Sequence, residues 1–202
     1  MSQHRPNKSK VANPLQKPWT KTEKSKSQGA KIAQAKPATT KPPRAVLDDE
    51  NKVYGDNACR VLFNQRPDSV VRLYVSQQMA PKFADVMKYL AAVKKAYHIV
   101  DEVELEKVAG SGHHGGIVML VKRKPVTALA QYLQQKGLKT DCLMAFDGVS
   151  NAHNLGAITR SCAHFGVGGI IMKQPELLQS GAALRTAEGG GEFVDGLSCD
   201  NL

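Results

Sequence analysis

The sequence has none of the long apolar stretches that mark membrane or secreted proteins. No run of about 18 apolar residues occurs, so we expect no membrane-spanning helix. No apolar segment of about 7–15 residues follows the positive charges near the amino terminus, so we expect no secretory signal. Together these features predict a cytoplasmic protein.

Cysteines at metal-binding or disulfide-framework spacing are also missing. The four cysteines include no C-x-x-C pair, and three of them fall within segments expected to be helices or strands. This pattern is typical of reduced, mostly buried thiols in the cytosol. We therefore expect neither a disulfide framework nor a metal site.

Acidic residues are almost absent from the first 44 positions. This segment holds eleven Lys or Arg residues, one Glu and six of the ten prolines, and its excess of ten positive charges equals the net charge of the whole chain. Such a composition cannot bury enough apolar area to offset the entropy of ordering. We expect residues 1–45 to form a disordered basic arm that adds affinity for phosphates, with a solubilising leader as the alternative.

Aromatic residues are few, at 5%, but an apolar content of 42% over 202 residues is enough for a packed core and one or two domains. Residues 46–121 are expected to form a small α/β domain in the order helix, strand, helix, strand, helix, strand. The expected elements cover residues 56–65, 70–76, 81–96 and 97–100, then residues 103–108 and a strand that ends at residue 121.

A basic hinge, K-R-K-P, opens a linker and helix at residues 122–140, with the helix expected over 127–136. The second domain, residues 141–202, begins with a short apolar strand at 141–146. A polar turn with helix-capping residues, a helix at 152–165, a glycine stop and a strand at 168–172 follow. This order predicts a βαβ unit of a mostly parallel sheet.

The helix at 152–165 separates polar from apolar side chains. At about 100° per residue, its apolar side chains share one face, while His153, Arg160 and His164 share another with Gly156 beside them. Asn154 lies in the first turn, near the carboxyl edge of the sheet, where ligands bind in open α/β folds. The spacing alone leaves open that Arg160 and Asn154 are ordinary solvated residues.

The segment D-G-V-S-N-A-H-N-L-G-A-I-T-R-S-C-A-H-F-G resembles motif 1 of the SpoU (TrmH) family of RNA ribose methyltransferases. The family pattern falls here on Asn154, Gly156 and Arg160, followed by Phe165-Gly166. The V-Y-G and H-H-G-G-I-V segments resemble the start and the end of the RNA-binding domain that precedes the catalytic domain in many members. The E-G-G-G-E-F-V segment resembles a second motif, in which the acidic residue would be Glu192.

The resemblance implies a fold and an activity. The fold would be α/β: a small αβα RNA-binding domain, then the first half of a trefoil-knotted (SPOUT) parallel α/β methyltransferase domain. The activity would be S-adenosylmethionine-dependent 2′-O-methylation of a ribose in tRNA or rRNA, without a metal. Catalytic roles would fall on Asn154, Arg160 and Glu192, and substrate-binding roles on Gly156, His153 and His114.

The glycine-rich, Ser/Asn-bearing loops that bind the methyl donor in this family would lie beyond Leu202. We therefore expect an incomplete S-adenosylmethionine site. Two alternatives remain open: an RNA-binding module without catalysis, and a truncated product that is inactive. A homodimer would be expected where the full knotted domain is present.

Overall fold

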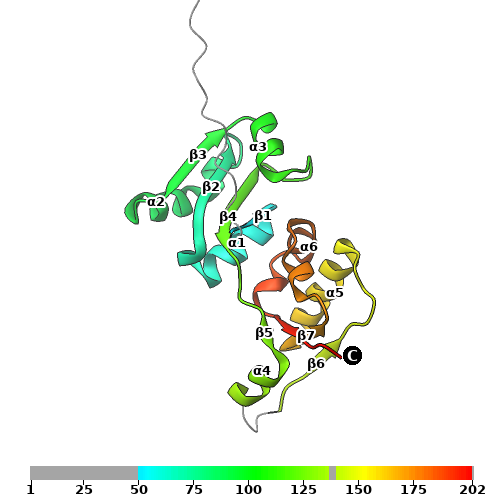
Figure 1. The fold of residues 1–202 in the computed structure, drawn as a ribbon. Coiled ribbons are helices and arrows are strands. Elements are labelled where there is room, and N and C mark those ends of the chain that lie inside the picture. The colour runs from blue at the N-terminus through cyan, green and yellow to red at the C-terminus, as the bar shows by residue number, and fades with distance from the viewer. Residues whose placement is uncertain (1–49, 137–139, 202) are drawn as a thin grey trace, which may run out of the picture. The chain divides into compact units, whose positions relative to one another are not determined.

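The computed structural model describes residues 50–136 and 140–201 (Figure 1). The basic arm expected at residues 1–45 lies outside the described residues. The described part of the chain contains two four-stranded sheets, each with its own helices.

The first sheet has the strand order β1-β4-β2-β3. Its strands are β1 (Glu50–Tyr54), β2 (Val70–Ser76), β3 (Ala96–Val100) and β4 (Ile117–Lys122). The strand β4 runs antiparallel to both β1 and β2, whereas β3 runs parallel to β2 at one edge. This sheet carries the small domain.

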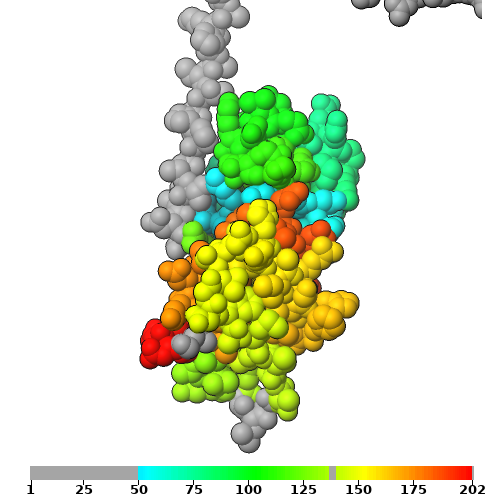
Figure 2. All heavy atoms as spheres, turned by 90° about the vertical axis from the view of Figure 1, so that its right-hand side faces the viewer, coloured from blue at the N-terminus to red at the C-terminus, as the bar shows by residue number. Residues whose placement is uncertain are grey.

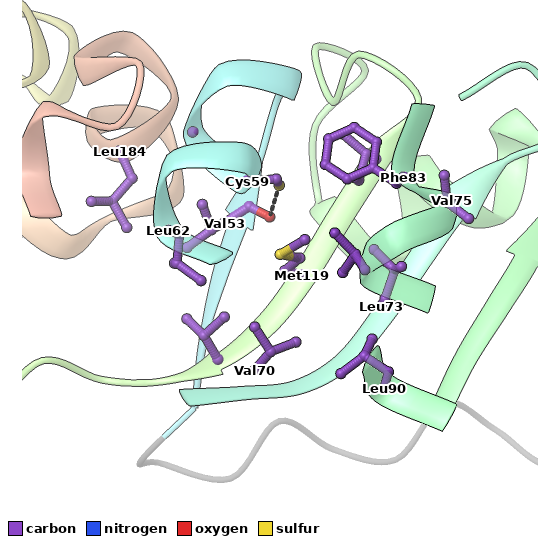
Figure 3. Close-up of a cluster of buried hydrophobic side chains, with 14 of the residues drawn as sticks. Val53, Cys59, Leu62, Val70, Leu73, Val75, Phe83, Leu90, Met119 and Leu184 are labelled. Carbon is purple, nitrogen blue, oxygen red and sulfur yellow. Dashed lines mark hydrogen bonds between the residues drawn. The ribbon is translucent and has the colours of Figure 1, made fainter. Parts of the chain in front are cut away.

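Helices cover both faces of the first sheet. Successive side chains of its central strands point to opposite faces, and each face has its own hydrophobic core. Along β4, Ile117, Met119 and Val121 pack with helices α1 (Asp56–Gln65) and α2 (Ala84–Ala92). Val118 and Leu120 point the other way, toward α3 (Glu102–Ala109). Figure 3 shows the first of these cores, with Leu62 of α1 and Leu90 of α2 on the same face of the sheet. The αβα arrangement expected from the sequence is confirmed.

Two boundaries in the small domain differ from the expectation. The segment E-N-K-V-Y is a strand, β1, because it pairs along its whole length with β4. The helix expected to run to residue 96 ends at Ala92, where the chain turns through Lys94, which has a φ of 57°. It then enters β3, with Ala96 paired to Arg72 of β2.

The second sheet is parallel throughout, with the strand order β5-β8-β7-β6. Its strands are β5 (Thr127–Ala128), β6 (Leu143–Ala145), β7 (Gly169–Met172) and β8 (Asp195–Ser198). Its helices are α4 (Leu129–Lys136), α5 (Ala152–His164) and α6 (Gly181–Ala187). The βαβ unit β6-α5-β7 has the predicted topology.

The strand β5 changes the expected role of the segment between the domains. Thr127 and Ala128 were expected to begin a helix, but they pair in parallel with Leu197 and Ser198 at the edge of the second sheet. This segment therefore contributes both an edge strand and a helix. The first strand of the second sheet along the chain is β5, and not the strand expected at 141–146. The domain boundaries themselves stay a prediction.

The two sheets are joined by direct contacts within one compact unit. Leu184 of α6 is buried in the core of the small domain, near Leu62 of α1 (Figure 3). The Gln179 side chain accepts a hydrogen bond from the Lys124 backbone N–H at 3.1 Å and donates one to the Lys124 carbonyl at 2.7 Å. The helix α6 therefore contacts the small domain while belonging to the second.

All four cysteines are free thiols. Cys59 and Cys162 are buried, and burial raises the pKa of both thiols. Cys142 is exposed and Cys199 is half-buried, so two rather than most of the cysteines are buried.

Candidate active site

The helix α5 is fixed at both ends by local hydrogen bonds. At its start, Asn151 Oδ1 accepts from the backbone N–H groups of His153 and Asn154, at 3.0 and 3.1 Å. At its end, Gly166 adopts a left-handed φ of 70°, and the Val167 N–H donates to the Cys162 carbonyl at 2.9 Å. These hydrogen bonds fix where α5 begins and ends.

Two predicted site residues, His153 and Arg160, line one open cleft of about 460 Å³. They are seven residues apart on α5, which places them on the same face of the helix. In Figure 2 the residues of α5, in yellow, border orange residues of the α6 region and cyan residues of the small domain. The remaining lining residues come from the small domain, from α6 and from the position just after α6: Gly55, Asp56, Asn57, Ala58, Gly115, Arg185, Thr186 and Glu188.

Arg160 is held by an acidic residue that sequence reasoning did not identify. Its Nη1 lies 3.2 Å from Oε1 of Glu188, just after α6. The other oxygen of Glu188 accepts from Asn57 Nδ2 of α1 at 3.3 Å. Glu188 has a left-handed backbone, with a φ of 48°, which is unusual for a residue with a side chain. Asn57 of the small domain and Arg160 of α5 therefore contact the same carboxylate, that of Glu188.

The other residues of motif 1 do not all meet in this cleft. The His153 ring lies 3.2 Å from Thr186 Oγ1, inside the cleft. Asn154 is exposed, and it does not line the cleft. Six residues separate it from Arg160, a spacing that places the two on different sides of a helix. The catalytic role expected for Asn154 stays a prediction.

The surroundings of Gly156 contradict the role that we expected for it. We expected it to let an RNA backbone approach, but it is buried against α6. A Cβ at this position would lie 2.4 Å from the Ala183 carbonyl oxygen and 2.6 Å from the Thr186 Cβ. The glycine is needed because it lets α5 and α6 pack closely.

Replacing Gly156 with alanine is expected to destabilise the fold by about 2–3 kcal/mol, because α6 backbone blocks the new methyl group. The loss would exceed the gain of about 1 kcal/mol that alanine brings to a helix. Urea unfolding gives the measurement, and Ser161→Ala on an exposed turn of α5 is the control. A Gly156 variant more stable than the parent would contradict the packing argument.

Glu192 lies in a different environment from Arg160. Its side chain is 5% exposed and accepts two hydrogen bonds from Arg66 of the small domain, at 2.6 Å from Nε and 3.1 Å from Nη2. This arrangement is an ion pair between the domains. The catalytic role expected for Glu192 stays a prediction.

His114 is also placed inside the protein. The residue is 4% exposed, its Nδ1 accepts from the Gly116 N–H at 3.1 Å, and its carbonyl accepts from the Gly55 N–H at 3.1 Å. It orders the loop that enters β4, and it approaches the cleft only through its neighbour Gly115. Direct substrate binding by His114 stays a prediction.

A second depression lies at the carboxyl ends of β6 and β7, where parallel sheets commonly bind ligands. It has a volume of about 270 Å³ and is lined by residues 146–150, residues 172–174 and Leu177. Its lining brings the polar turn before α5 next to the residues at the end of β7 and just after it.

The part of the chain that the structure describes contains no group of three or more His, Cys, Asp or Glu side chains placed to hold a metal ion. Among the same residues, no helix is long and apolar enough to cross a membrane.

Comparison with known proteins gives a family for the small domain. Residues 52–127 match the model of the SpoU substrate-binding family, described as RNA 2′-O ribose methyltransferase substrate binding. The chain is 47% identical over 154 residues to an uncharacterized tRNA/rRNA methyltransferase, YfiF, of Escherichia coli O157:H7. It is also 30% identical over 158 residues to the 23S rRNA (guanosine-2′-O-)-methyltransferase RlmB of Acinetobacter baylyi.

These alignments cover most of this chain but less of its relatives. They span 76% of the chain and 44% of the E. coli protein, and 74% of the chain and 61% of the A. baylyi protein. The chain thus spans less than half the length of the first of these relatives.

Solved structures support the fold. The AdoMet-bound rRNA methyltransferase from Sinorhizobium meliloti superposes with a TM-score of 0.56 at 15% identity, over 74% of this chain and 54% of that one. The SpoU methyltransferase AviRb from Streptomyces viridochromogenes superposes with a TM-score of 0.55 at 17% identity, over the same shares. The expected α/β fold, a small αβα domain joined to a parallel α/β domain, is confirmed.

Proposed function

We propose that this chain, which resembles the SpoU family of RNA 2′-O-ribose methyltransferases, acts in S-adenosylmethionine-dependent methylation of a ribose 2′-hydroxyl. The substrate would be tRNA or rRNA, encountered in the cytoplasm. The observation that carries the proposal is the cleft in which Arg160 of motif 1 meets residues of the RNA substrate-binding domain.

Arg160 would act on the hydroxyl that receives the methyl group. A ribose hydroxyl is a weak nucleophile near neutral pH, and a guanidinium beside it favours the developing oxyanion and lowers its pKa. Arg160 contacts Glu188 through Nη1, and its side chain is 59% exposed. A guanidinium has five N–H donors, so others remain for the ribose and an adjacent phosphate.

The residues of the cleft would hold the RNA so that the hydroxyl stays in place. Asn154, in the first turn of α5, is the second motif residue that we propose for contact with the ribose or phosphate. S-adenosylmethionine would supply the methyl group. Binding of RNA and donor in a fixed orientation contributes much of the rate in a reaction of this kind. A homodimer built through the methyltransferase domain is part of the same proposal.

A second function, RNA binding without methyl transfer, is favoured by one observation. The family model that matches this chain, over residues 52–127, describes substrate binding rather than methyl transfer. A test must therefore separate binding of the donor from binding of the RNA.

Incubation with S-adenosylmethionine carrying a labelled methyl group is expected to label bulk tRNA or rRNA at ribose oxygens. A 2′-O-methyl group blocks the attack that cleaves RNA in alkali, so labelled dinucleotides that survive alkaline digestion are the readout. Calorimetry with S-adenosylmethionine and RNA binding are measured in parallel. RNA binding with neither donor binding nor label would favour the second function.

A further inference from the structure

The charged side chains of the cleft are largely neutralised by one another, with one exception. Asp56 forms an ion pair with Lys82, and Arg160 forms one with Glu188. Arg185, on the exposed side of α6, forms no ion pair with any residue in the described ranges 50–136 and 140–201. Within the part of the chain that the structure describes, Arg185 is therefore the charged side chain of the cleft that lacks an ion-pair partner.

The position of Arg185 is set by contact between the two domains. Its Cγ lies 3.4 Å from the point where a Cβ on Gly55 would be. Gly55 has a φ of 95°, a conformation that favours glycine, and the absence of a side chain there leaves room for the arginine stem. The aliphatic part of Arg185 thus lies against the small domain, and the residue lines the cleft.

The other cleft residues favour a phosphate rather than a base as the ligand. No Phe, Tyr or Trp lines the cleft, so it offers no aromatic side chain for stacking apart from the His153 ring. A guanidinium binds two oxygens of a phosphate in a fixed geometry, and such contacts position a nucleic acid without reading its sequence.

We propose that Arg185 binds a backbone phosphate of the RNA strand and so orients it along the cleft toward Arg160. The proposal rests on the proposed function, because it takes RNA as the ligand. Arg185 would supply the sequence-independent contact at the domain junction, because the other described arginine that lines the cleft, Arg160, is paired with Glu188.

The test compares RNA binding by Arg185→Gln with that by Lys88→Gln, which removes the same charge from the exposed side of α2. The full chain is titrated with a fluorescein-labelled tRNA transcript at several salt concentrations. For Arg185→Gln we expect affinity about 5–10-fold lower at low salt, and a plot of log affinity against log salt that is shallower by about 0.7–0.9, as expected for one lost phosphate contact. For Lys88→Gln we expect little change.

A residue-level readout separates this effect from RNA binding elsewhere in the chain. Phenylglyoxal modifies accessible arginines, and mass spectrometry of the peptide that contains Arg185 reports its rate. Bound RNA is expected to slow modification of Arg185 severalfold in the parent protein. Arg185→Lys, which keeps the charge, should retain most of the salt dependence.

The outcomes distinguish this inference from the proposed function. If the parent chain binds RNA but Arg185→Gln matches Lys88→Gln, and RNA does not protect Arg185, the inference is overturned while RNA binding stands. If the parent chain binds no RNA, the proposed function and the inference fail together.

Discussion

Replacing Arg160 with alanine is expected to lower methyl transfer to RNA by about 10²–10³-fold, the usual effect of removing one donor that stabilises a developing oxyanion. The loss should appear mainly in kcat, because the interaction grows as the hydroxyl loses its proton. The fold should be almost unaffected. The Arg160 side chain is 59% exposed and its pair with Glu188 is a surface ion pair, worth about 0–1 kcal/mol.

Two further variants show which property of Arg160 matters. Arg160→Lys keeps the charge but loses the planar fork, so we expect an intermediate rate. Glu188→Gln keeps Arg160 and removes its carboxylate partner, so the rate should change far less than in Arg160→Ala. Initial rates with the same labelled RNA provide the comparison. A rate near that of the parent in Arg160→Ala would remove Arg160 from the chemistry.

The parts of the fold that could be predicted are those with a local signal. The helix at 152–165 was identified from its capping residues and glycine stop, and the structure gives Ala152–His164. The strand β1 was missed because its sequence, E-N-K-V-Y, has no clear alternation and becomes a strand through pairing with β4. The two-residue strand β5 is likewise defined by its pairing with β8.

The same distinction applies to the candidate site. The spacing of His153 and Arg160 predicted one shared face, and both line the cleft. Glu188 and Arg185 were not identified, because they reach the cleft only when α6 packs between α5 and the small domain. The contact between Asn57 and Glu188 joins residues 131 positions apart, and no local pattern reports such a contact.

Removing Arg66 is expected to destabilise the protein, because its ion-pair partner Glu192 is a buried carboxylate. Glu192 is 5% exposed, and Arg66 provides its two side-chain hydrogen bonds. Arg66→Met would leave a buried carboxylate without its cation, which costs about 3–5 kcal/mol when both partners are buried. Arg66 is 23% exposed, so we expect about 3 kcal/mol, measured by urea unfolding.

The double variant Arg66→Met/Glu192→Met tests whether the ion pair is only a structural contact or whether Glu192 also takes part in the reaction. Apolar residues of similar volume can replace a buried ion pair with little loss of stability, so the double variant should recover most of the stability that Arg66→Met loses. If the pair only joins the domains, the double variant should also keep methyl transfer near the parent rate. A stable double variant with a rate as low as that of Arg160→Ala would instead assign Glu192 to the reaction, as the resemblance in its sequence motif first suggested. Stability and rate together therefore separate a structural contact between the domains from a catalytic carboxylate.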